Sequence, residues 1–228
     1  MQLVFIRHGQ PAWDLDGLAV DNPGLTDIGH EQAARLAERL SCIDTLAVDE
    51  LLVSPLVRAQ QTAAPIADAL GLRPSTLEWL REIQAPAFEG TPTQQVQRVF
   101  EENRGRSVDD LWDGLPGGES FRDFHERVTG GVRGLLADAG AVPVSPAPPM
   151  WKLDHAERVV MVVAHAGTNA TAIGFLLGIA PVPWEWERFV SFHASVSTLV
   201  PMSISGASSF SLFRFSDVGH LPEELQTR

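Results

Sequence analysis

Two short apolar runs in this sequence each end at a histidine, and they constrain the fold more than any other feature. The first is "LVFIRHG" at residues 3–9, and the second is "VVMVVAHAG" at residues 159–167. Continuous apolar runs between helical patterns are typical of strands buried on both faces of a parallel or mixed sheet. Because open α/β sheets bind ligands at the carboxyl ends of their strands, we expect His8 and His165 to face one shared pocket.

The patterns around these runs predict an α/β fold. Apolar residues recur at helical spacing after Thr26, which can cap a helix, and before Gly71, which can end one. We predict one domain over residues 1–228, in which the proline-rich stretch 141–155 is an exposed excursion without a core pattern. The predicted strands lie near residues 3–6, 46–53, 76–80, 159–164, 195–202 and 209–215, the predicted helices near 26–40, 56–70 and 92–103, after Ser120 and after His165, and the main loops at 10–24 and 81–91.

The composition disfavours several classes of protein. The formal net charge of −12 argues against a nucleic-acid or anionic-membrane binder, because both need a basic face. No run approaches the roughly 18 apolar residues that cross a bilayer. The single cysteine, Cys42, cannot form an internal disulfide or a cysteine metal site, so we expect a reducing, cytoplasmic location without a signal peptide.

Four side chains at the predicted strand ends carry the chemistry. Strand 46–53 leads into "SPLVRAQQTA", which brings Arg58 to the first turn of the next helix, where anions bind well. With Arg7 it would form an oxyanion clamp, since guanidinium groups bind phosphoryl oxygens in fork geometry. A neutral imidazole of His8 or His165 can attack phosphorus. An acid for the leaving oxygen is still required, and "LREIQAPAFEG" offers two glutamates in a loop.

An ordered set of motifs extends this pattern along the chain. "LVFIRHG", "LTDIGHEQA", "SPLVRAQQTA", "LREI…FEG", "GGES", "VVAHAG" and "DVGHLP" follow one another between residues 3 and 222. Together they resemble the histidine phosphatase superfamily, and more narrowly its phosphoglycerate-mutase-like branch. The resemblance implies a three-layer α/β/α sandwich around a mixed, mostly parallel sheet. It also implies catalysis without a metal ion or another cofactor, because arginine and histidine charges take the role of the metal.

The resemblance assigns roles to individual positions. His8 would be the nucleophile that becomes phosphorylated, and Glu82 would protonate the leaving group and later activate water. Glu89, in the same loop as Glu82, is given no such role, and we expect it to support the loop by binding backbone amides. The phosphoryl group would be bound by Arg7, Arg58 and His165, the last of which also counts among the catalytic residues. The substrate pocket would be lined by Gly9, Gln10, Trp13 and Ala166. Three positions depart from the family's usual residues, namely Pro11, Asp14 and Ala166.

We therefore predict a phosphomonoesterase that acts through a phosphohistidine on His8. Its expected partner is a small phosphorylated metabolite, with no nucleic acid and no membrane, and a homodimer is compatible with the sequence. One alternative is a cofactor-dependent phosphoglycerate mutase, which residues 81–90 disfavour because they lack the cations of the mutases' "ERHYG"-like stretch. Another is a non-catalytic module that binds a phosphorylated ligand, which would not need to retain a nucleophile.

Overall fold

The computed structural model describes residues 1–42, 47–153 and 157–228 and contains an eight-stranded mixed sheet with the order β5-β4-β8-β1-β9-β10-β7-β6. The first four strands in this order run parallel to one another. The other four each join their neighbour antiparallel. These strands are β1 (Gln2–Arg7), β4 (Glu50–Val53), β5 (Ser75–Thr76), β6 (Val142–Pro146), β7 (Pro149–Lys152), β8 (Val159–Ala164), β9 (Val196–Ile204) and β10 (Ala207–Asp217).

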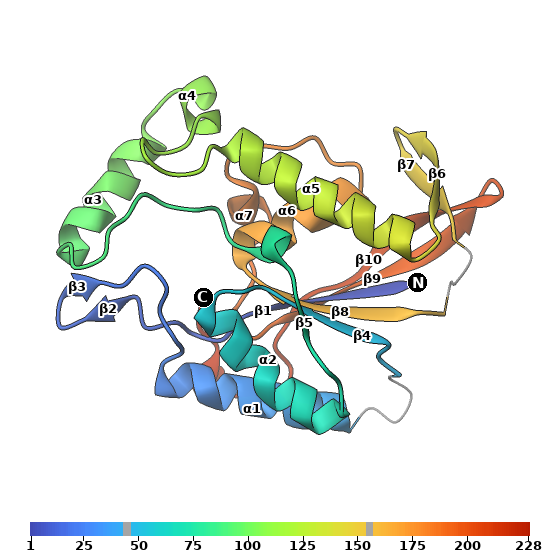
Figure 1. Ribbon diagram of the computed structural model, residues 1–228, viewed down its shortest axis with the longest axis horizontal. Helices are drawn as coiled ribbons and strands as arrows, with labels where there is room; N and C mark the ends of the chain where they lie inside the picture. Colours follow the sequence, from blue (N-terminus) through green and yellow to red (C-terminus); the bar gives the residue numbers. More distant parts are fainter. Residues whose placement is uncertain (43–46, 154–156) are drawn as a thin grey trace.

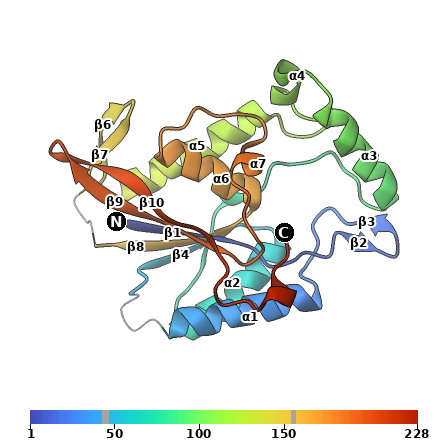
Figure 2. The same ribbon diagram turned by 180° about the vertical axis from the view of Figure 1, so that it is seen from behind.

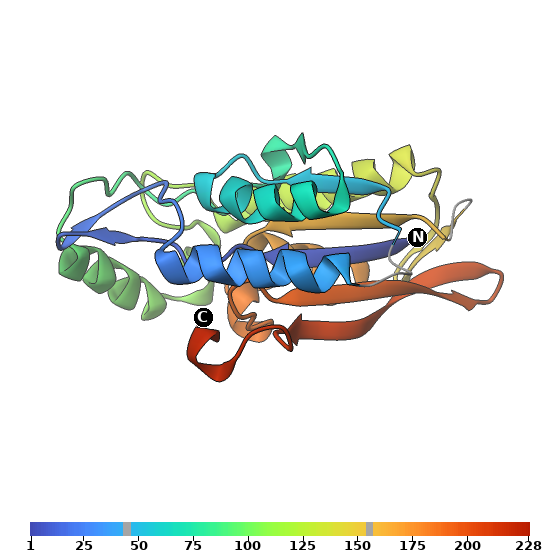
Figure 3. The same cartoon turned by 90° about the horizontal axis from the view of Figure 1, so that it is seen from below.

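Helices cover both faces of this sheet, which gives the predicted three layers (Figures 1 and 2). Along β1, Val4 and Ile6 pack against α1 and α2, which lie side by side across one face (Figure 3). Leu3 and Phe5 pack on the opposite face against α5 and α6. Both faces are buried, and this explains why the strand is apolar at every position. These helices are α1 (Asp27–Ser41), α2 (Val57–Leu70), α5 (Phe121–Asp138) and α6 (Ala166–Leu176).

The helix ends follow the capping signals in the sequence. The Thr26 hydroxyl accepts a hydrogen bond from the Gly29 amide at the start of α1, and Ser120 does the same for the Asp123 amide at the start of α5. Gly71 ends α2 in the left-handed conformation with φ 65°, where a side chain would be strained. The predicted caps are therefore confirmed at these three positions.

The proline-rich stretch differs from its prediction as an exposed excursion. Residues 142–152 form the hairpin β6–β7, which extends the sheet beyond β10. Trp151 is buried in the core and packs edge-on against Phe210, whereas Val142 and Val144 on the edge strand are exposed. Prolines are tolerated on an edge strand because its outer N–H groups need no partner, so the stretch joins the sheet despite them. Residues 154 and 155 lie outside the described residues.

Two other strand predictions were too long. Only Ser75 and Thr76 pair with β4, and residues 78–80 form a 3-10 helix where the strand was predicted to continue. The strand predicted at 46–53 begins at Glu50, and residue 46 lies outside the described part of the chain. None of the helices within the described ranges is long and apolar enough to cross a lipid bilayer.

A small lobe lies beyond the carboxyl ends of the parallel strands (Figure 1). It contains a hairpin, β2 (Asp14–Leu15) and β3 (Leu18–Ala19), inside the segment that was predicted as a loop. Its helices are α3 (Thr93–Arg104) and α4 (Val108–Trp112), and α7 (Glu185–Arg188) packs near α6. The Thr93 hydroxyl donates to Asp14 Oδ2 at 2.5 Å and joins the hairpin to α3. This lobe is positioned to border a ligand held at the sheet edge.

Candidate active site

His8 follows the last residue of β1, and its side chain is only 3% exposed. Its Nδ1 lies 2.7 Å from the Gly9 carbonyl oxygen, and its Nε2 lies 3.2 Å from Arg58 Nε. A carbonyl can only accept and a guanidinium can only donate, so the hydrogen is on Nδ1 and the lone pair is on Nε2. Nε2 is therefore the nitrogen of His8 that can act as a nucleophile.

The surroundings of His8 keep its ring neutral. Burial lowers the pKa of His8 well below its ordinary value, and the nearby His165 and Arg58 lower it further. A low pKa leaves the Nε2 lone pair free of a proton at neutral and mildly acidic pH. A Cβ at Gly9 would lie 2.6 Å from the Gly29 carbonyl oxygen, so glycine at this position lets the turn pack directly against α1.

Two arginines flank the imidazole of His8. Arg58 comes from the first turn of α2, is 2% exposed, and lies beneath the Trp13 ring with 4.6 Å between its Cζ and the ring centroid. Arg7 donates from Nη1 to the Ser191 carbonyl at 2.5 Å. Burial lowers the pKa of each guanidinium to about 10, so both remain charged at neutral pH. Together they make this edge of the sheet strongly attractive to an anion.

His165 completes the group from the end of β8. Its ring centroid lies 5.0 Å from that of His8, and its side chain is 1% exposed. It is the N-cap residue of α6, and its Nε2 lies 2.7 Å from the hydroxyl of Ser54, which follows β4. Burial, followed by Arg58 and Arg7, lowers the pKa of His165 well below its ordinary value. The two strand ends thus bring two neutral imidazoles side by side.

Glu82 lies at the N-terminus of α6, beside His165. Its carboxylate accepts from the Gly167 amide at 2.8 Å and from the Thr168 amide at 3.2 Å. A Cβ on Gly167 would lie 2.5 Å from Glu82 Oε1, so only glycine leaves room for the carboxylate. Glu82 also acts electrostatically on both Arg7 and Arg58, so its charge lies near both guanidinium groups.

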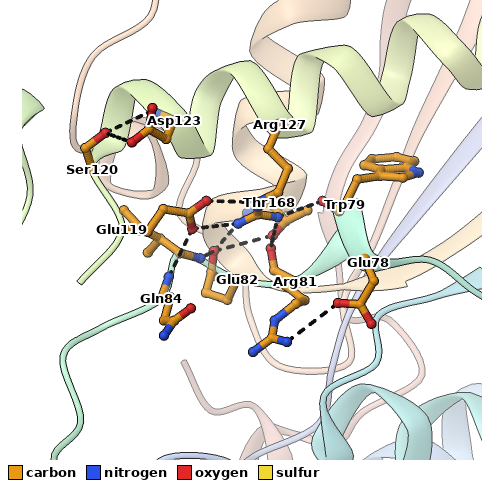
Figure 4. A network of polar contacts seen from close by, with 11 residues as sticks. Glu78, Trp79, Arg81, Glu82, Gln84, Glu119, Ser120, Asp123, Arg127 and Thr168 are labelled. Carbon is orange, nitrogen blue, oxygen red and sulfur yellow. Dashed lines mark hydrogen bonds and ion pairs between the residues drawn. The ribbon is translucent and has the colours of Figure 1, made fainter. Parts of the chain in front are cut away.

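Arg127 on α5 holds the loop that carries Glu82 (Figure 4). Its Nη1 donates to the carbonyl oxygens of Trp79 and Arg81 at 3.0 and 3.1 Å. Its Nε and Nη2 bind both oxygens of Glu119 at 2.8 and 2.7 Å, and Glu119 accepts from the Gln84 amide at 3.1 Å. This bidentate pair is partly buried and fixes the backbone on both sides of Glu82.

Trp13, Ala166 and Gln10 were also predicted to line the substrate pocket. Trp13 is 48% exposed and its ring stacks on the Arg58 guanidinium, and Ala166 is the first residue of α6, next to His165. The Gln10 side chain accepts from the Thr26 hydroxyl at 2.8 Å, and this bond directs its amide oxygen to the start of α1.

Two acidic residues of the loops beside the site, Asp14 and Glu89, are bonded to other residues of those loops. Asp14 accepts from Thr93 and from the Gly17 amide, so its charge points into the lobe. Glu89 accepts from the Asp21 amide at 2.8 Å, which supports the prediction that it stabilises its loop. Of the two glutamates in this stretch, Glu82 is the one beside His165.

Two residues of the site were not found from the sequence. His193 is 5% exposed, its ring centroid lies 5.8 Å from that of His8, and its Nε2 accepts from Arg7 Nη2 at 3.0 Å. Its position shortly before β9 carries no motif that could have indicated this. Ser54 directly follows β4, so the strand-end argument applied to His8 and His165 could have found it. Within the described ranges, no three His, Cys, Asp or Glu side chains gather where they could hold a metal ion.

Comparison with known families agrees with this geometry. The model of the histidine phosphatase superfamily (branch 1) matches residues 3–203, a range that includes every residue of the cluster described above. The chain belongs to this superfamily.

Three similar proteins match different shares of this chain. It is 43% identical over 91 residues to the PE-PGRS family protein PE_PGRS11 of Mycobacterium tuberculosis, a match that covers 39% of this chain and only 15% of that protein. It is 28% identical to the probable phosphoglycerate mutase GpmB of Yersinia enterocolitica, over 79% of this chain and 77% of the relative. A solved structure of mycobacterial glucosyl-3-phosphoglycerate phosphatase with inorganic phosphate matches with a TM-score of 0.69 at 25% identity, over 97% of this chain and 99% of the other.

Proposed function

We propose that this protein is a metal-independent phosphatase that hydrolyses phosphate monoesters through a phosphohistidine on His8. The observation that carries the proposal is the position of His8 Nε2, a neutral lone pair in contact with Arg58 and beside His165. The paired cations would hold a phosphoryl group within reach of that lone pair. The proposed substrates are small phosphorylated metabolites, and the single cysteine supports a reducing cytoplasmic setting.

The proposed reaction has two steps. In the first, the Nε2 lone pair of His8 forms a bond to phosphorus, the bond from phosphorus to the alcohol oxygen breaks, and Glu82 gives that oxygen a proton. In the second, a water oxygen attacks phosphorus while Glu82 takes the water's proton. The N–P bond then breaks, and its electron pair returns to Nε2. The sum of the steps converts a monoester and water into an alcohol and phosphate.

In both steps the phosphoryl oxygens would be bound by the charged Arg7 and Arg58 and by a hydrogen bond from the neutral His165. The equatorial oxygens of a transferring phosphoryl group carry the developing negative charge, and guanidinium groups match them in geometry and sign. The positive end of α6 lies at the same place, because His165 caps that helix. A solved neighbour that is named a phosphatase and contains inorganic phosphate supports this assignment.

The second candidate is a phosphoglycerate mutase, since one relative bears that name. A mutase must retain its phosphohistidine and also hold the carboxylate of a phosphoglycerate. In this chain, the loop after Glu82 contains no arginine or lysine up to residue 97, and its Glu89 is bonded to the Asp21 amide. The lack of a second cationic subsite in this loop favours hydrolysis over transfer.

The deciding experiment measures phosphate release and phosphohistidine together. We expect the wild-type protein to release phosphate from p-nitrophenyl phosphate and to form acid-labile, base-stable phosphoprotein on rapid quenching, whereas His8→Ala should do neither. Isomerisation of 3-phosphoglycerate without net phosphate release would favour the mutase. Phosphate binding without turnover across a panel of metabolite monoesters would instead favour a non-catalytic binding module.

A further inference from the structure

A small cavity lies against Arg7. It offers about 10 Å³ for the centre of a water molecule, which is close to the space that one water needs. Most of its wall is apolar and includes Phe5, Ile173 and Phe215. The smaller polar part is formed by Arg7, Asn169 and three serines.

Four of the polar wall residues have a buried atom without a hydrogen-bond partner in the described part of the chain. These atoms are Arg7 Nε, Asn169 Oδ1, Ser191 Oγ and Ser195 Oγ. The asparagine and both serines are less than a tenth exposed. A buried polar atom that stays unpaired destabilises the folded protein, so four such atoms on residues that line one small cavity point to a shared partner.

We propose that this cavity binds one structural water molecule, which fixes the orientation of the Arg7 guanidinium. The hydrogen-bond inventory balances: the water accepts from Arg7 Nε–H and from one serine hydroxyl, and it donates to Asn169 Oδ1 and to the other serine. A tetrahedral water uses all four of its bonds in this arrangement. An anion fits less well, since Asn169 Oδ1 is an acceptor.

The water would complete the restraint of Arg7. Nη1 is held by the Ser191 carbonyl and Nη2 by His193, while Nε has no protein partner among the described residues. With Nε bonded to the water, all three nitrogens are anchored, and each Nη keeps one N–H for a phosphoryl oxygen. Asn169 and Ser195 are then positioning residues, which act on phosphate through the water and Arg7.

The first test is a crystal structure of the wild-type protein at about 1.6 Å resolution. We expect a single density peak within hydrogen-bond distance of Arg7 Nε and at least two of the other three atoms. A cavity without density would overturn the proposal. So would an anomalous peak at this place after a bromide soak, which would identify a halide. This test does not depend on the enzymatic activity.

The second test concerns phosphate affinity and rests on the proposed function. We expect Ser195→Ala and Asn169→Leu each to weaken the binding of inorganic phosphate about three- to tenfold in calorimetry. Because both residues act through one water, the double variant should bind phosphate as tightly as the weaker-binding of the two single variants. Ser211→Ala, a serine on β10 outside this cavity, should leave the affinity unchanged. Unaltered affinity in both single variants, in protein that melts as a folded species, would overturn the positioning role. If the wild-type protein binds no phosphate, the proposed function fails, while the crystallographic result still decides the water site.

Discussion

Arg58 Nε donates a hydrogen bond to His8 Nε2, the same nitrogen that would attack phosphorus. In the free protein this hydrogen bond occupies the lone pair of His8 Nε2 and fixes the orientation of the imidazole ring. A bound phosphoryl group would draw the guanidinium toward its own oxygens and release the lone pair at the moment it is needed. Arg58 is thus suited both to bind the anion and to keep the imidazole aimed at it.

The first prediction removes this contact with Arg58→Met, which keeps the apolar length but not the charge. Because Arg58 lowers the pKa of His8, we expect the pKa of His8 to rise in the variant, while burial still holds it below its ordinary value. Phosphatase turnover should fall by about 10²-fold or more, as for loss of an oxyanion donor. Nitrogen NMR of labelled histidine should show the hydrogen on Nδ1 in the wild-type protein at both pH 5 and pH 7. A protonated Nε2 at pH 7 would contradict the tautomer assigned here.

The second prediction follows from three buried histidines, His8, His165 and His193. Burial lowers the pKa of each in the folded protein, in the case of His193 to about 3, whereas the unfolded value is about 6.5. These three rings alone therefore bind about three more protons in the unfolded chain at pH 5, and the lowered pKa values of His125 and His220 act in the same direction. The free energy of unfolding is thus highest above about pH 6.5 and falls as the pH is lowered toward the folded values. Each proton contributes up to about 1.4 kcal/mol per pH unit.

Urea unfolding between pH 4 and pH 8, in buffer without phosphate, measures this dependence. His193→Gln can keep the bonds to Arg7 and Thr227, and it should reduce the proton uptake on unfolding by about one. A free energy of unfolding that is flat over this range, or a variant with the wild-type slope, would show that these rings are not buried in the neutral form.

Some residues and contacts of the site could be predicted from the sequence, and others could not. His8 and His165 were predictable because each follows an apolar run, and parallel strands deliver their ends to one edge. Arg7 and His193 are 186 residues apart, and no local pattern encodes a contact over that distance. The β6–β7 hairpin was missed for another reason: its prolines break the strand pattern, and only Trp151 marks the buried face.

The third prediction concerns the Arg127–Glu119 pair that holds the loop of Glu82. Arg127→Lys keeps the charge but cannot bind both Glu119 oxygens and two carbonyl groups at once. We expect kcat to fall about tenfold with little change in KM, because Glu82 acts on the leaving group while the arginines bind the phosphate. Arg133→Lys, on the same helix, is the matched control and should keep wild-type kinetics. A rise in KM at constant kcat would assign the pair to substrate binding instead.

The last prediction separates the two proposed steps with Glu82→Gln. Glutamine can still accept the Gly167 amide hydrogen bond through its oxygen, but it cannot supply or take a proton. For alkyl phosphates, whose leaving oxygen needs a proton, we expect turnover to fall by about 10²- to 10⁴-fold. p-Nitrophenolate leaves without a proton, so His8 should still be phosphorylated, whereas water attack lacks its base.

Rapid-mixing kinetics of this variant with p-nitrophenyl phosphate should therefore show a burst of about one nitrophenolate per protein, followed by a slow steady state. Phosphohistidine should reach a similar level during that steady state, higher than the level trapped by rapid quenching of the wild-type protein. Slow release with neither a burst nor phosphohistidine would mean that Glu82 is required before phosphoryl transfer, as a group that organises the N-terminus of α6. Wild-type rates with alkyl phosphates would remove Glu82 from the chemistry altogether.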